Sequence, residues 1–204
     1  MQQFSLSANI EEGLSKNFQY IVTPNARDVA SGLVDGYRTG IHSFTIIGSY
    51  GTGKSSFLLA LEKDLQSKGS YSLLNPHTLS ANAKFDVLKI VGDYKDLVSL
   101  MRDKLSVDGT ADNVLDRLRE IYNQAKKQGK FLVIFIDEFG KVLEHAAKNN
   151  PEQELYFMQK LAEFVNVSTR QILLVTTLHQ NFSAYARKLS TLQKEEWTKV
   201  KGRF

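Results

Sequence analysis

The sequence predicts an α/β fold in which a mainly parallel β-sheet lies between two layers of helices. Three runs of β-branched, aromatic and aliphatic residues have the length of buried strands: 43–49 (SFTIIGS), 131–137 (FLVIFID) and 171–177 (QILLVTT). Segments with apolar residues at helical spacing separate these runs. Because strands that alternate with helices pair in parallel and need cover on both faces, we expect a three-layer α/β/α sandwich.

The first predicted elements lead to the strand at 43–49. Residues 1–17 are polar and lack clear periodicity, so we expect a flexible lead-in before a domain that spans 18–204. Thr23 is placed to cap a helix whose first residue is Pro24, a frequent arrangement at helix starts. The helix predicted after the strand has four apolar positions, which are Phe57, Leu58, Leu61 and Leu65.

The later elements complete the alternation. Two segments, 71–75 (YSLLN) and 86–92 (DVLKIVG), are both candidates for a further strand, and the sequence does not rank them. A helix is predicted to end at Gly129, and FLVIFID after it suits a central strand that is covered on both faces. A helix from about Pro151 to Val165 precedes the last predicted strand. The helix before Gly129 is predicted from Leu115, Leu118, Ile121, Tyr122 and Ala125.

Composition excludes several classes of protein. The chain has 204 residues, no run of 18 apolar residues and no basic-then-apolar N-terminal segment, so we expect neither a membrane span nor a signal peptide. It contains no cysteine, which excludes disulfides and thiolate metal sites and fits a cytoplasmic protein. The net charge of +4 permits contact with nucleic acid, although the scattered charges favour a mildly basic surface.

The segment GSYGTGKS satisfies the pattern G-x-x-x-x-G-K-[ST] between a predicted strand and a predicted helix. Glycines let the backbone turn so that N–H groups converge, and the helix start adds positive potential, so the segment is suited to polyphosphate. It resembles the Walker A loop of P-loop NTPases, which implies that Lys54 reaches the outer phosphates and Ser55 binds Mg²⁺. The residues expected to hold the nucleotide are Gly48, Ser49, Tyr50, Gly51, Thr52, Gly53, Lys54, Ser55 and Ser56.

The segment FLVIFIDEFG resembles a Walker B motif, an apolar strand that ends in an acidic pair. The resemblance implies that Asp137 holds Mg²⁺, directly or through water, and that Glu138 is the general base that activates water. Residues 137–140 also read D-x-x-G, as in GTPases. The chain lacks an N-K-x-D-like segment for guanine, and the acidic pair is typical of glutamate-bearing ATPases, so ATP is favoured over GTP.

Residues 20–204 taken together resemble the AAA+ ATPases. That family implies a sheet in the order 5-1-4-3-2, with one strand inserted between the Walker A and Walker B strands. It also implies a polar sensor 1 residue at the end of the next strand, for which Thr177 is our choice and His179 the alternative. Thr176 is expected to face the other side of the sheet, because side chains alternate along a strand.

The last residues, Gly-Arg-Phe, resemble the AAA+ segment whose arginine enters the nucleotide site of a neighbouring subunit. This implies that Arg203 is an arginine finger and that the full-length protein is a homo-oligomer, whereas the plainer interpretation is a basic tail. The family pattern further implies that the chain stops inside the ATPase module, without its helical lid, as the front part of a larger protein.

Three functions of different class follow from these motifs. The first is Mg²⁺-dependent ATP hydrolysis that drives conformational change in an assembly. The pattern TPNA…GTGKSSFL…IDEFGK is similar to large prokaryotic ATP-binding proteins of defence and DNA-transaction systems, which makes nucleic acid a candidate partner. The second is a slow nucleotide-dependent switch or scaffold. The third, a small-molecule kinase, is disfavoured because few arginines follow the Walker B strand and Glu138 favours water as acceptor.

Overall fold

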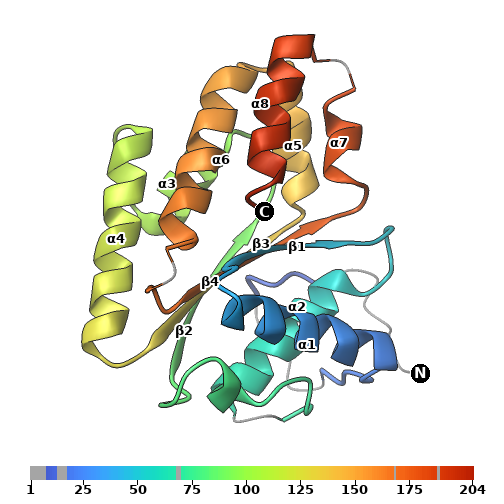
Figure 1. Cartoon of the computed structure of the whole chain (residues 1–204), viewed down its shortest axis with the longest axis vertical. Coiled ribbons are helices and arrows are strands. Elements are labelled where there is room, and N and C mark those ends of the chain that lie inside the picture. Colours follow the sequence, from blue (N-terminus) through green and yellow to red (C-terminus); the bar gives the residue numbers. More distant parts are fainter. Residues whose placement is uncertain (1–7, 13–17, 68–69, 168, 188) are drawn as a thin grey trace.

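The structure is a computed structural model that describes residues 8–12, 18–67, 70–167, 169–187 and 189–204. It has the predicted α/β architecture, a parallel sheet with helices on both faces (Figure 1). The order β1-β4-β3-β2 is the predicted order without its fifth strand, and in the described part of the chain no other strand joins this sheet. The strands are β1 (Ser43–Ile47), β2 (Phe85–Val91), β3 (Phe131–Asp137) and β4 (Ile172–Leu178).

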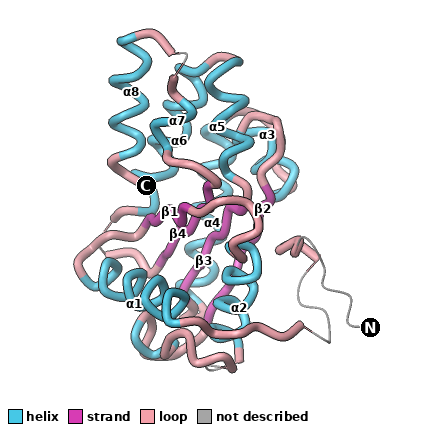
Figure 2. Tube along the Cα trace, turned by 90° about the vertical axis from the view of Figure 1, so that its right-hand side faces the viewer, coloured by secondary structure: helices cyan, strands magenta, loops and turns pink. Residues whose placement is uncertain are grey.

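The helices divide unequally between the two faces of the sheet. α1 and α2 pack on one face, and the other face carries α3 to α8. Figure 2 shows α5 to α8 above the strands, and α1 and α2 in the lower part of the view. The helices are α1 (Pro24–Arg38), α2 (Lys54–Gln66), η1 (Pro76–Thr78), α3 (Leu97–Leu105), α4 (Ala111–Lys127), α5 (Phe139–Lys148), α6 (Pro151–Val165), α7 (Phe182–Tyr185) and α8 (Thr191–Lys201).

The central strand β3 explains why its sequence is apolar throughout. All seven of its residues are buried. Ile134 and Ile136 pack into the core beneath α3 to α8, whereas Val133 and Phe135 pack into the core beneath α1 and α2. Since neighbouring residues of a strand point to opposite faces, a strand covered on both sides has no position left for a polar side chain until its end.

The structure ranks the two candidate strands that the sequence left open. Residues 85–91 form β2, which pairs with β3, whereas residues 71–75 form a loop. The loop backbone is held by the carboxylate of Asp64, a fully buried residue of α2. Its Oδ2 accepts hydrogen bonds from the N–H groups of Leu73 (2.6 Å) and Leu74 (3.4 Å). A side chain therefore satisfies backbone groups that a strand would have paired.

The chain near its start contributes to the core. Ile10 is fully buried in the cluster that contains α1 and α2, and Glu11 forms an ion pair with Lys104 of α3 (3.0 Å). Residues 8–12 of the predicted lead-in thus pack on the domain, while 1–7 and 13–17 lie outside the described residues. Within the described ranges, no helix combines the length and the apolar character that a membrane crossing needs.

Candidate active site

The glycine-rich loop joins β1 to α2 and has the backbone that its glycines allow. Gly51 (φ +76°) and Gly53 (φ +85°) adopt left-handed conformations, which a side chain would strain. Gly53 is the N-cap of α2 and offers no capping side chain, and the first turn of α2 holds no acidic residue. The N–H groups at this helix end are consequently left for an anion, as phosphate binding requires.

Lys54 is folded back onto its own loop. Its Nζ donates hydrogen bonds to the carbonyl oxygens of Gly48 (2.5 Å) and Ser49 (2.9 Å). Burial lowers the pKa of Lys54, while the nearby carboxylates of Asp137 and Glu138 act in the opposite direction. A cation that is held only by neutral carbonyls can turn to a phosphate, because a charged acceptor forms the stronger hydrogen bond.

Asp137 and Thr177 are joined at the ends of neighbouring strands. The Thr177 hydroxyl donates to Asp137 Oδ1 (2.5 Å) and accepts a hydrogen bond from the N–H of Glu138 (3.0 Å). The same N–H also donates to Asp137 Oδ1 (3.0 Å). Both hydrogen bonds that the described residues make with this carboxylate fall on Oδ1, which leaves Oδ2 to a cation or a water.

Glu138 directly follows β3 and begins α5 from an unusual backbone conformation. Its φ of +51° lies in the left-handed region, and its side chain forms an ion pair with Lys141 in the first turn of α5. Gly92, just after β2, donates its N–H to the Asp137 carbonyl (2.7 Å). A Cβ at Gly92 would lie 2.5 Å from the carbonyl oxygen of Glu138, so only glycine fits this close approach.

The two threonines of β4 face opposite sides, as alternation predicts. Thr176 forms a hydrogen bond with the Thr45 hydroxyl of β1 (2.9 Å), whereas Thr177 lies at the acidic pair. His179, the alternative sensor residue, stacks on Tyr50 of the glycine-rich loop with ring centroids 4.6 Å apart. Its Nδ1 is also 3.1 Å from the Tyr185 hydroxyl. Thr177 is thus held by the acidic pair, and His179 by two aromatic side chains.

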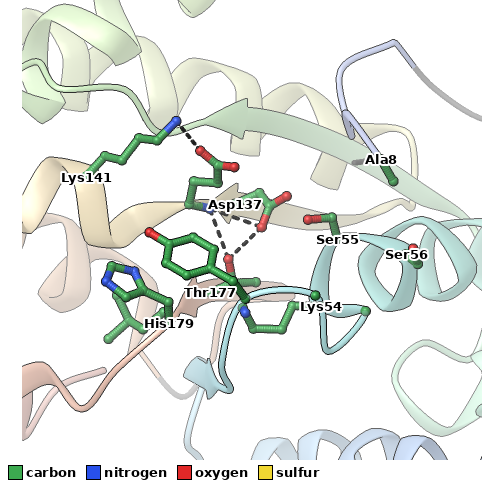
Figure 3. Close-up of a pocket in the computed structure, with 13 residues that line it drawn as sticks. Ala8, Lys54, Ser55, Ser56, Asp137, Lys141, Thr177 and His179 are labelled. Carbon is green, nitrogen blue, oxygen red and sulfur yellow. Dashed lines mark hydrogen bonds and ion pairs between the residues drawn. The ribbon is translucent and has the colours of Figure 1, made fainter. Parts of the chain in front are cut away.

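These groups line one pocket of about 260 Å³ (Figure 3). The glycine-rich loop, the tip of β3 and the tip of β4 form its walls, and Ala8 lies at its edge. Figure 3 shows the Ser55 hydroxyl and the Asp137 carboxylate facing each other across it. Of the predicted nucleotide-binding residues, the pocket contains Tyr50, Gly51, Gly53, Lys54, Ser55 and Ser56 in its lining, and Gly48, Ser49 and Thr52 belong to the loop behind it.

The pocket has the donor set that a magnesium ion needs. A hydroxyl and a carboxylate oxygen are hard ligands of the kind Mg²⁺ prefers, and this ion commonly takes only one or two protein ligands with substrate phosphates and water. No cluster of three or more His, Cys, Asp or Glu side chains suited to a metal occurs in the described part of the chain. Ser55 and Asp137 therefore fit Mg²⁺ shared with a phosphate better than a dedicated metal cage.

Arg203 does not line the pocket of its own chain. Its guanidinium forms an ion pair with Glu163 of α6, and its carbonyl accepts hydrogen bonds from Ser43 and Asn166. The aromatic ring of Phe204 stacks on Phe139 with centroids 5.6 Å apart. The Gly-Arg-Phe segment is thus held against the domain, with the arginine side chain at its surface.

Sequence reasoning gave no role in this site to Lys141, which lines the pocket, or to Gly92, which lies against the Glu138 backbone. Lys141 shows no motif of its own, but it stands three residues after Glu138, and such residues are neighbours on a helix. Gly92 ended a predicted strand, and its closeness to Glu138 depends on the pairing of β2 with β3. Both could be found only by combining a motif with the geometry of the elements around it.

Comparison with known proteins agrees with the geometry. The model of the family described as "ATPase family associated with various cellular activities (AAA)" matches residues 44–197. No significant match was found among curated protein sequences.

Solved structures with a similar fold include the Aeropyrum pernix ORC2 protein in its ADPNP–ADP complexes. The two chains are 13% identical with a TM-score of 0.50, over 89% of this chain and 48% of that one. Others are C. elegans PCH-2 (17%, TM-score 0.46, 86% and 42%) and Cdc6p from Pyrobaculum aerophilum (15%, 0.45, 91% and 46%). The chain therefore spans about half the length of these proteins, and at such identities the likeness concerns the fold.

Proposed function

This chain belongs to the ATPase family associated with various cellular activities (AAA), and we propose that it binds ATP with Mg²⁺ in the pocket of Figure 3 and hydrolyses it. One observation carries the proposal. The glycine-rich loop before α2 and the acidic pair after β3 line the same pocket, with the Thr177 hydroxyl bonded to that pair. A phosphate cradle opposite a carboxylate pair is the arrangement that phosphoryl transfer to water needs.

The residues divide the work by their chemistry. The N–H groups of the glycine-rich loop and of the first turn of α2 bind the phosphates. Lys54 leaves the carbonyls of Gly48 and Ser49 and pairs with the outer phosphates. Ser55 and Asp137 hold Mg²⁺, and Glu138 accepts the proton of the attacking water. Bound Mg²⁺ supplies charge neutralisation on the phosphate oxygens. The Thr177 hydroxyl holds the Asp137 carboxylate and the Glu138 backbone in position through its two hydrogen bonds.

Replacement of Glu138 tests hydrolysis separately from binding. We expect Glu138→Gln to bind Mg²⁺–ATP with at least wild-type affinity while phosphate release falls by about 10²-fold or more, since general base catalysis contributes roughly 10²–10⁴-fold. Phosphate release is measured in single turnover, and affinity by calorimetry. Unchanged phosphate release in this variant would remove Glu138 from the mechanism. Glu195→Gln, which removes an exposed carboxylate of α8 outside the pocket lining, is the matched control.

The second candidate is a nucleotide-dependent switch, and the ion pair between Glu138 and Lys141 favours it. A base that is already held by a cation is not free to activate water, so turnover in this state is expected to be slow. A switch retains its biological output in the Glu138→Gln variant, whereas a motor loses it. Kinase activity is disfavoured further if phosphate is released without an added acceptor.

We also propose that Arg203 acts in the pocket of a neighbouring copy within an assembly, where such an arginine contributes about 10³–10⁵-fold to the rate. Its position at the surface, outside its own pocket, supports this role. Arg203→Ala is expected to lower turnover only at concentrations at which the chain associates. Equal loss at concentrations where it is monomeric would contradict the role in trans.

Nucleic acid is proposed as a partner of the protein, in keeping with the net charge of +4. ATP turnover measured with and without DNA tests this directly. An increase that disappears with added salt is expected, because phosphate contacts are salt-dependent. No change at low salt would contradict it.

A further inference from the structure

Two lysines line the pocket, and each has a partner from its own chain. Lys54 donates to neutral carbonyls of the glycine-rich loop, whereas Lys141 is paired with the carboxylate of Glu138. Figure 3 shows Lys141 across the acidic pair from Lys54, with a dashed line for its ion pair. The proposed hydrolysis gives Lys54 and Glu138 roles in binding and catalysis, and it assigns Lys141 no contact with the nucleotide.

The charges around Lys141 keep it protonated and inside the site. Its contact with the Glu138 carboxylate raises its pKa, and the negative charges of Glu138 and Asp93 add to this effect against its burial. The side chains of Lys141 and Glu138 are 44% and 41% exposed, and the pair joins residues one helical turn apart. Pairs of this kind are weak, since exposed ion pairs change an equilibrium by a few-fold at most. Lys141 can therefore exchange its partner.

We propose that Lys141 exchanges Glu138 for the terminal phosphate of bound ATP and thereby distinguishes the triphosphate from the diphosphate. The inference rests on the proposed function, because it takes the pocket to be the ATP site. A terminal phosphate carries more negative charge than a single carboxylate and offers several acceptor oxygens, so it is the stronger partner for an ammonium group. ADP lacks the γ-phosphate, the group that lies at this position in ATP, so Lys141 remains paired with Glu138 when the diphosphate is bound.

The exchange has a consequence for Glu138. While Lys141 is bound to it, the carboxylate has a cation as its partner and cannot act freely on water. When ATP binds, Lys141 turns to the γ-phosphate, and Glu138 loses its cationic partner at the same time. The structure thus contains a restraint on the proposed base that ATP removes and ADP does not.

Nucleotide affinities test the exchange without any turnover. Dissociation constants for Mg²⁺–ADPNP and Mg²⁺–ADP are measured by calorimetry on the wild-type chain and on Lys141→Met, Lys141→Arg and Lys199→Met. We expect Lys141→Met to weaken ADPNP binding about threefold to fivefold more than ADP binding, the range of an exposed ion pair. Lys141→Arg should keep the wild-type preference. Lys199 has a similar one-turn pair with Glu196 and does not line the pocket, so its variant should change neither affinity.

The competing partner gives a second test. Glu138→Gln removes the charge that holds Lys141, so the preference for ADPNP over ADP should rise by a similar factor, and Lys141→Met should cost more ADPNP affinity in this background than in the wild type. The Glu138→Gln variant by itself remains informative if Lys141→Met does not fold. Equal effects on both nucleotides in every background would overturn the inference. If the wild-type chain binds neither nucleotide, the proposed function itself fails.

Discussion

We predict that the Thr177 hydroxyl stabilises the fold by holding the acidic pair, Asp137 and Glu138, at the end of β3. It is 1% exposed and makes two hydrogen bonds, one to the Asp137 carboxylate (2.5 Å) and one from the Glu138 N–H (3.0 Å). Thr177→Val removes both bonds and preserves the shape and the branching at Cβ. The change therefore isolates the hydroxyl from the packing of β4.

The magnitude follows from the partners that remain. A hydrogen bond to a charged group contributes about 1.5–3 kcal/mol. The Glu138 N–H keeps Asp137 Oδ1 as an acceptor (3.0 Å), so losing its second acceptor adds little. We expect Thr177→Val to lower the free energy of unfolding by about 2–3 kcal/mol, most of it because Asp137 is buried and loses its hydroxyl donor.

Urea unfolding of the chain without nucleotide, followed by circular dichroism, measures this change. Thr177→Ser is the matched control, because it keeps the hydroxyl and loses one methyl group, for a cost of about 1 kcal/mol. The reasoning is refuted if Thr177→Val is as stable as Thr177→Ser, since the hydroxyl would then contribute no more than the methyl group that the control lacks.

Two further predictions concern packing and pH. Gly92→Ala should lower the free energy of unfolding by about 1–3 kcal/mol, because the added Cβ would lie 2.5 Å from the carbonyl oxygen of Glu138. Gly32→Ala in α1 is the control: its Cβ would meet no atom within 4 Å, so this change should be neutral or stabilising. Urea unfolding that ranks the two variants the other way would contradict this prediction. Burial raises the pKa of Glu154 from 4.5 to about 7, in spite of its hydrogen bond from the Leu97 N–H (3.2 Å). Since the folded state holds this proton more tightly than the unfolded state, its contribution to stability is present below pH 4.5 and is lost as pH rises through 7. Glu154→Gln should therefore stabilise the chain more at pH 8 than at pH 4.5, by about 3 kcal/mol in the free energy of unfolding, and parallel pH profiles for the variant and the wild type would contradict it.

The sequence was sufficient for the elements whose pattern is unambiguous. Strand β3 lies at the predicted residues 131–137, and α6 has the predicted bounds Pro151–Val165. The predictions for these segments were correct because burial on both faces of a strand, or on one face of a helix, requires apolar residues at a recognisable spacing. The predicted strand at 43–49 was two residues too long, because Gly48 and Ser49 already belong to the turn into the glycine-rich loop.

The features that the sequence did not predict depend on contacts between residues that are not neighbours in the chain. The segment 71–75 has the composition of a strand, but Asp64 binds its backbone, and no local pattern reveals such a partner. The role of Thr177 is similar. Its place at the end of β4 was predicted, but its bonds to the acidic pair arise from the pairing of β4 with β3. The motifs predicted which segments line the pocket, whereas the pairing of the strands determines which of their side chains are in contact.

Binding of Mg²⁺–ADPNP to the isolated chain is the most direct test that this pocket is a nucleotide site. Calorimetry on the wild-type chain, on Lys54→Ala and on the distant control Lys199→Ala compares the pocket with an exposed surface charge. We expect saturable binding by the wild type and the control, and none by Lys54→Ala although it unfolds at the wild-type temperature. Equal binding by all three chains, or none by the wild type, would contradict the assignment.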